Sequence, residues 1–96
     1  MKSIRILLAV DHGVVRKGLR FLLERDERME VIGEAADGRE AVKLAEELDP
    51  QVVIMDIAMP QLNGIEAAAQ IVKRKPEIGV VILSMHSDEG YLIRSL

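Results

Sequence analysis

The sequence predicts an α/β fold, a doubly wound parallel sheet with helices on both faces. Short runs rich in valine, isoleucine and leucine alternate with amphipathic segments of about ten residues, as in βαβ units. The run at 52–56 stays apolar without alternation until it stops at an acid, which is typical of a strand covered on both faces. Two of the runs end in acids, at the edge where open α/β sheets place their chemistry.

The first half of the chain contains two predicted strand–helix units. Residues 4–10 form an apolar strand, and residues 14–25 show the spacing of a helix. A short second strand at 31–35 leads into a helix at 37–48. This helix starts with an acid followed three residues later by a glutamate, a pattern close to a capping box, and Pro50 stops it.

The second half repeats the same order. The strand at 52–56 is followed by a helix at 63–75, which Pro76 closes. The fourth strand covers 79–84. A serine, an aspartate and a glutamate then indicate another helix start, so we expect residues 87–96 to lie in a helix.

Composition restricts the class of protein. The chain has 96 residues, is 49% hydrophobic and 30% charged, and carries a net charge of −3, which fits one domain over residues 1–96. Without cysteine it has no disulfide, thiolate nucleophile or zinc–thiolate site. The acidic balance and the scarcity of aromatic residues argue against nucleic-acid binding by this domain. No apolar run is long enough to span a membrane and no signal peptide is evident, so we expect a cytoplasmic protein.

Three polar residues fall at predicted strand ends. Asp11 follows the first strand, Asp56 ends the third and Ser84 ends the fourth. If the first and third strands are neighbours, both carboxylates face one crevice. Such a pair suits Mg²⁺, which takes one or two carboxylates, keeps water ligands and accepts a phosphate oxygen. Taken singly, each residue is more often a turn former than a site residue; the three together favour a site.

The chain resembles the receiver domains of two-component response regulators, most closely those of the NarL/FixJ class. The resemblance covers the whole chain and is carried by ILLAVDH at 6–12, VRKGL at 15–19, GEAADG at 33–38, DP at 49–50, MDIAMP at 55–60, NGIE at 63–66 and LSMH at 83–86. It implies a flavodoxin-like fold with strand order 2-1-3-4 for the strands present here. We expect the family's fifth strand and fifth helix to be missing, so that as a receiver domain the chain would be C-terminally incomplete.

The resemblance also implies roles for five residues. Asp56 matches the phospho-acceptor, which takes a phosphoryl group from a sensor histidine kinase. Asp11, Asp56 and the backbone carbonyl of Ala58 match the Mg²⁺ ligands, and Ser84 matches the hydroxyl that contacts the phosphoryl group. Ala58 and His86 occupy positions that modulate phosphoryl lifetime. The implied protein is a signalling protein and not an enzyme; its output, transcription regulation, belongs to a DNA-binding domain outside this chain.

The sequence departs from the family pattern in two respects. Val10 replaces the first of two adjacent acids that the family has at the end of strand one, so Mg²⁺ should bind more weakly. The family's lysine, which pairs with the phosphoryl group, is absent with the fifth strand. Lys17 does not replace it, because it lies on the helix after strand one with Arg16 and is expected to be solvated.

We also expect self-association, as a homodimer or a segment-exchanged oligomer. Without a fifth strand, residues 80–83 would form a sheet edge with unpaired backbone groups and no charge to deter pairing. A sheet face would also lose its covering helix. The apolar segment 91–96 would be free to dock elsewhere, including on a second copy.

Two other functions remain open. A receiver-like protein-interaction module that no longer signals would explain Val10 and the absent lysine. A small phosphatase with an aspartate nucleophile is the third reading, but such enzymes need a second acid two residues further on, where this chain has Ala58.

Overall fold

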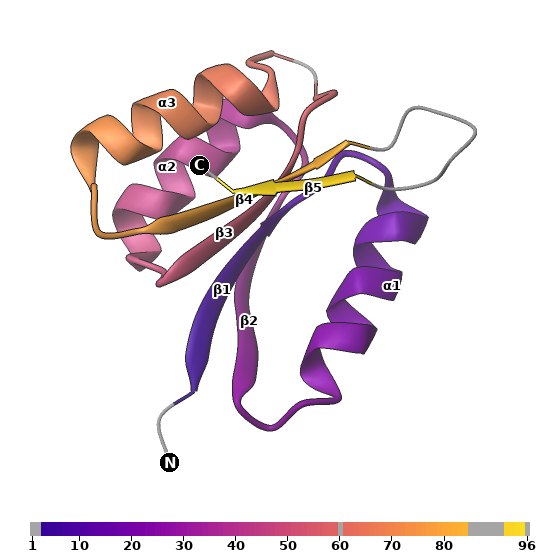
Figure 1. Ribbon diagram of the computed structural model, residues 1–96. Coiled ribbons are helices and arrows are strands. Elements are labelled where there is room, and N and C mark those ends of the chain that lie inside the picture. Colours follow the sequence, from indigo (N-terminus) through magenta and orange to yellow (C-terminus); the bar gives the residue numbers. More distant parts are fainter. Residues whose placement is uncertain (1–2, 60, 85–91, 96) are drawn as a thin grey trace.

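The computed structural model describes residues 3–59, 61–84 and 92–95 and contains one five-stranded sheet. The strand order is β2-β1-β3-β4-β5, so the predicted order 2-1-3-4 is confirmed (Figure 1). The pairs among β1 to β4 are all parallel. The strands are β1 (Ile4–Ala9), β2 (Met29–Ala35), β3 (Val52–Asp56), β4 (Gly79–Ser84) and β5 (Leu92–Ser95).

Three helices connect the parallel strands: α1 (Gly13–Glu24), α2 (Gly38–Leu48) and α3 (Gly64–Arg74). The two expected helix caps are present. The Asp37 carboxylate accepts a hydrogen bond from the Glu40 N–H at 2.8 Å, and the Asn63 side chain accepts one from the Glu66 N–H at 2.9 Å. Each cap satisfies a backbone donor that a helix start leaves unpaired. None of the helices in the described residues is long and apolar enough to cross a membrane.

The helices cover the sheet unequally. α2 and α3 lie on one face and α1 lies on the other (Figure 1). The larger core cluster joins α2 and α3 to alternate residues of the central strands, among them Leu7, Val53 and Ile82. The smaller cluster, around Leu8 and Val10, packs against α1. This alternation along each strand is what sheet geometry requires when both faces are covered.

The end of the chain differs from the sequence expectation. Leu92–Ser95 is a strand that pairs antiparallel with β4, with Leu83 opposite Ile93, and not part of a helix at 87–96. The expected start of that helix, at 87–89, lies outside the described residues. The expectation that β4 is an unpaired edge is also wrong, because β5 supplies hydrogen-bond partners that an exposed edge would otherwise lack. Self-association of the chain stays a prediction.

Candidate functional site

The candidate site lies at the carboxyl ends of β1 and β3. Ala9 at the end of β1 is level with Met55 of β3, and continuing this register by one residue puts Val10, which follows β1, level with Asp56. Asp11 and His12 follow in the loop before α1. On the other side, Asp56 is level with Leu83 of β4, so Ser84 comes just beyond it. The strand order therefore brings the three predicted strand ends to one edge of the sheet.

Asp56 is the only charged residue among the buried side chains in the described part of the chain, with 1% of its surface exposed. Its Oδ1 atom accepts a hydrogen bond from the Ala58 N–H at 3.2 Å. Its Oδ2 atom is buried and has no hydrogen-bond partner within the described residues. The Nδ1 atom of the His12 imidazole lies 4.0 Å from Oδ2. A buried carboxylate oxygen without a donor is costly, and such atoms mark places where a ligand or ion belongs.

Burial raises the pKa of Asp56 above its ordinary value of 3.8. The Ala58 N–H and the His12 ring act in the opposite direction, and the neighbouring Asp11 carboxylate raises the pKa further. Asp11 and Asp56 are thus close enough to repel each other. Two repelling carboxylates, one of them desolvated, favour a bound cation.

The raised pKa predicts a stability effect of Asp56→Asn. The pKa of Asp56 is higher in the folded than in the unfolded state. Its stabilising contribution to the free energy of unfolding is therefore fully present below about pH 3.8 and is lost as the pH rises through the folded-state pKa. At pH 7, without metal, we therefore expect Asp56→Asn to be more stable than wild type by about 1 kcal/mol. Urea unfolding in a chelating buffer measures this. If the stability difference between Asp56→Asn and wild type did not decrease between pH 7 and pH 3, the raised pKa of Asp56 would be contradicted.

The turn after Asp56 is held by backbone contacts. The Ile57 N–H donates to the Leu83 carbonyl at 3.0 Å, and the Ile57 carbonyl accepts from the Gly64 N–H at 2.9 Å. A Cβ atom at Gly64 would lie 2.2 Å from the Asp56 carbonyl oxygen, so only glycine permits α3 to start this close to the site. The turn thus fixes where Ala58 presents its N–H to Asp56.

The structure places the predicted residues as follows. Asp11 and Ala58 are exposed at the rim, beside the buried Asp56. Ser84 ends β4, but its side chain is outside the described part, and His86 lies wholly outside the described residues. Val10 is fully buried, in the core cluster with Leu8, so it contributes no polar group to the site.

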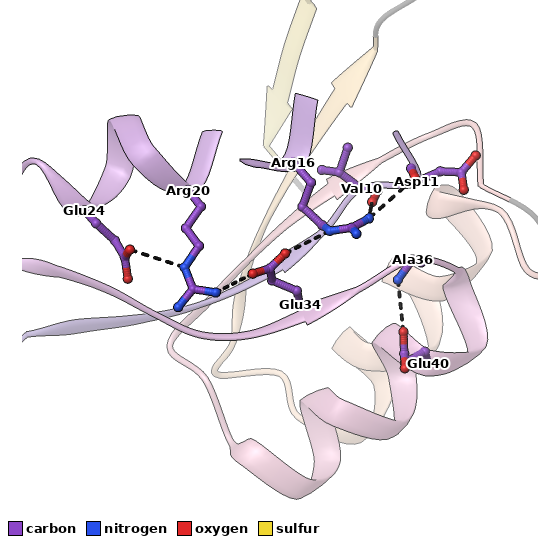
Figure 2. Close-up of polar contacts among 8 residues, drawn as sticks. All are labelled: Val10, Asp11, Arg16, Arg20, Glu24, Glu34, Ala36 and Glu40. Atoms are coloured by element: carbon purple, nitrogen blue, oxygen red, sulfur yellow. Dashed lines mark hydrogen bonds and ion pairs between the residues drawn. The ribbon is translucent and has the colours of Figure 1, made fainter. Parts of the chain in front are cut away.

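Sequence reasoning missed Arg16. Its side chain is only 22% exposed and donates to the Val10 carbonyl at 2.7 Å and to Glu34 at 2.9 Å (Figure 2). No periodic signal marks it, because its partners come from other elements. Lys17, with which it was grouped, is exposed as expected.

The site's carboxylates fit Mg²⁺. Among the described residues, no three histidine, cysteine, aspartate or glutamate side chains are clustered so that they could hold a metal ion. Mg²⁺ does not need such a group, since it binds through one or two carboxylates and retains water. The donor set consists of Asp11 and the buried Oδ2 of Asp56, which has no hydrogen-bond partner among the described residues.

Comparisons with known proteins agree with this arrangement. A family model described as the response regulator receiver domain matches residues 6–96. The transcriptional regulatory protein YhcZ of Bacillus subtilis is 41% identical over 92 residues, covering 96% of this chain. The transcriptional regulatory protein LiaR of the same organism is 45% identical over 86 residues, covering 90% of this chain. The chain spans only part of these curated relatives, 43% of the first and 41% of the second.

A solved structure shares the fold. The two-component response regulator of the LuxR family from Aurantimonas sp. SI85-9A1 superposes with a TM-score of 0.84 at 40% sequence identity, covering 90% of this chain and 61% of that one. The resemblance inferred from the sequence is therefore confirmed, and it extends from motifs to the arrangement of the strands.

Proposed function

This chain belongs to the response regulator receiver family, a signalling family and not an enzyme family, and on that premise we propose that Asp56 is its phospho-acceptor. The observation that carries the proposal is the buried Asp56 Oδ2 atom, which has no hydrogen-bond partner within the described residues. With one oxygen desolvated and not engaged by a donor of the described residues, the Asp56 carboxylate is available to attack an electrophile.

The proposed reaction is a transfer from a phosphohistidine. An Asp56 carboxylate oxygen attacks phosphorus, a P–O bond forms, the P–N bond to the imidazole breaks, and the released imidazole nitrogen takes up a proton from water. The product is an acyl phosphate on Asp56. The Ala58 N–H, 3.2 Å from Oδ1, holds the carboxylate in one orientation during the attack.

Mg²⁺ is the proposed cofactor, in keeping with the family. Asp11, Asp56 and the backbone carbonyl of Ala58 would hold it, and it would neutralise the charge that a phosphoryl group adds to a crevice already holding two carboxylates. Ser84 is the proposed hydroxyl contact of the phosphoryl group. Ala58 and His86 are the proposed positions that set how long the modification lasts.

The proposed partner is a sensor histidine kinase in the cytoplasm, and the proposed output is transcription. Both follow from the family and from relatives named as transcriptional regulators. One observation favours a second candidate, a receiver-like interaction module that no longer signals. Val10 is fully buried in an apolar cluster, at the position where the family has an acid.

Phosphorylation with a small donor distinguishes the two candidates. The chain is incubated with acetyl phosphate and Mg²⁺ and weighed by intact mass spectrometry. We expect one phosphoryl group on the wild type, none on Asp56→Asn, and slower addition to Asp11→Asn. An unmodified wild type would favour the interaction module, and an adduct that persists in Asp56→Asn would reject Asp56 as the acceptor.

A further inference from the structure

A chain of ion pairs links α1 to the second strand of the sheet. Glu34 on β2 accepts a hydrogen bond from Arg16 Nε at 2.9 Å through one carboxylate oxygen and is paired with Arg20 through the other (Figure 2). Arg20 also donates to Glu24 at 3.2 Å. Burial alone would raise the pKa of Glu34, but the hydrogen bonds from Arg20 and Arg16 outweigh it and lower that pKa. Glu34 is therefore a charged anchor for both arginines.

Arg16 extends this chain to the site. While Nε is held by Glu34, its NH1 group donates to the Val10 carbonyl at 2.7 Å and lies 3.5 Å from the Asp11 carbonyl. The guanidinium thus reaches the backbone that carries Asp11 and not its carboxylate, which points away from it in Figure 2. The Val10 N–H of the same segment donates to the Ala35 carbonyl at the end of β2 at 3.1 Å.

We propose that Arg16, anchored by Glu34, is a positioning residue that fixes the Val10–Asp11 backbone and thereby presents Asp11 to Mg²⁺. The inference rests on the proposed function. It has a particular reason in this chain: because Val10 replaces an acid, Asp11 has no adjacent carboxylate to share the metal site, and its own orientation matters more. A planar guanidinium can hold a carboxylate and a carbonyl at once, which an ammonium group cannot do in the same geometry.

Arg20 provides a matched control. It lies one helical turn after Arg16 on α1 and pairs with the same carboxylate, but its contacts are with Glu34 and Glu24. Arg20→Gln and Arg16→Gln each remove one positive charge and one ion pair to Glu34. Only Arg16→Gln also removes the hydrogen bond to the Val10 carbonyl.

The sign of the effect separates positioning from charge. Removing a positive charge near a cation site favours cation binding, so a purely electrostatic Arg16 would give tighter Mg²⁺ binding in Arg16→Gln. Loss of positioning gives weaker binding. Arg16→Lys retains the charge but loses the planar guanidinium that contacts Glu34 and the Val10 carbonyl at once, so it should bind Mg²⁺ as weakly as Arg16→Gln.

The test is a Mg²⁺ titration of the chain by calorimetry, with amide shifts of residues 11 and 58 as a second readout. We expect about tenfold weaker binding in Arg16→Gln and Arg16→Lys, and wild-type affinity in Arg20→Gln. Should Arg16→Gln fail to fold, Arg16→Lys, which keeps the charge and the aliphatic stem, decides the matter. Wild-type or tighter binding in Arg16→Lys would overturn the inference alone, whereas a wild-type chain that bound no Mg²⁺ would overturn the proposed function with it.

Discussion

Val10→Asp is expected to tighten Mg²⁺ binding about 10- to 100-fold, the range typical of groups that support a metal ligand. Continuing the β1–β3 register places position 10 level with Asp56. Leu8 and Ile54, two residues before these positions, both belong to the cluster on the α1 face, so the side chains of residues 10 and 56 point to that same face. A carboxylate introduced at position 10 would therefore lie next to the Asp56 side chain, where it can accept a hydrogen bond from a metal-bound water.

The same substitution should make the metal-free fold less stable, by about 3 kcal/mol. Val10 is fully buried, and an aspartate there places an unpaired charge in an apolar cluster beside a carboxylate whose pKa burial already raises. Stability and metal affinity should thus change in opposite directions, so that Val10→Asp becomes stable mainly when Mg²⁺ is present.

Calorimetric Mg²⁺ titration and urea unfolding, with and without chelator, measure both effects. Val10→Asn is the control, because it buries a polar group of similar size without adding charge. It should be destabilised without gaining Mg²⁺ affinity. Equal Mg²⁺ affinities of wild type and Val10→Asp would show that position 10 does not reach the site.

Gly38→Ala is expected to destabilise the fold by about 3 kcal/mol, a large effect for one methyl group. A Cβ atom at Gly38, the first residue of α2, would lie 1.7 Å from the Leu62 carbonyl oxygen. The obstruction is backbone, so the β3–α3 loop that carries Ala58 must move away. We therefore expect Asp56 to accept phosphate from acetyl phosphate more slowly as well.

Gly18→Ala is the matched control for this prediction. Gly18 lies inside α1, and a Cβ there would meet nothing within 4 Å among the described residues outside its own helix and chain neighbours. Alanine should therefore stabilise α1 by about 0.5 to 1 kcal/mol. Chemical denaturation of both variants gives the comparison; a Gly38→Ala protein as stable as wild type would mean that the loop is free to shift.

The local patterns of the sequence determined the four parallel strands, the three helices between them and the position of Asp11 and Asp56 at two strand ends. Strand runs, helix spacing and caps such as Asp37 are visible in sequence because each depends on residues a few positions apart. The strand order followed from the family resemblance. The role of Asp56 as acceptor candidate also followed from the resemblance. Its place at the end of an apolar strand indicated only that it lies at the edge where open α/β sheets bind ligands.

Only the tertiary structure decided the remaining features. It placed Leu92–Ser95 as an antiparallel strand on β4, where a cap-like pattern had indicated a helix, because an open strand edge offers hydrogen bonds to any extended segment that reaches it. It also joined Arg16 to Glu34, 18 residues apart, and brought Gly38 against Leu62. Such contacts depend on how whole elements pack against each other, and packing between distant segments leaves no periodic pattern in the sequence around either residue.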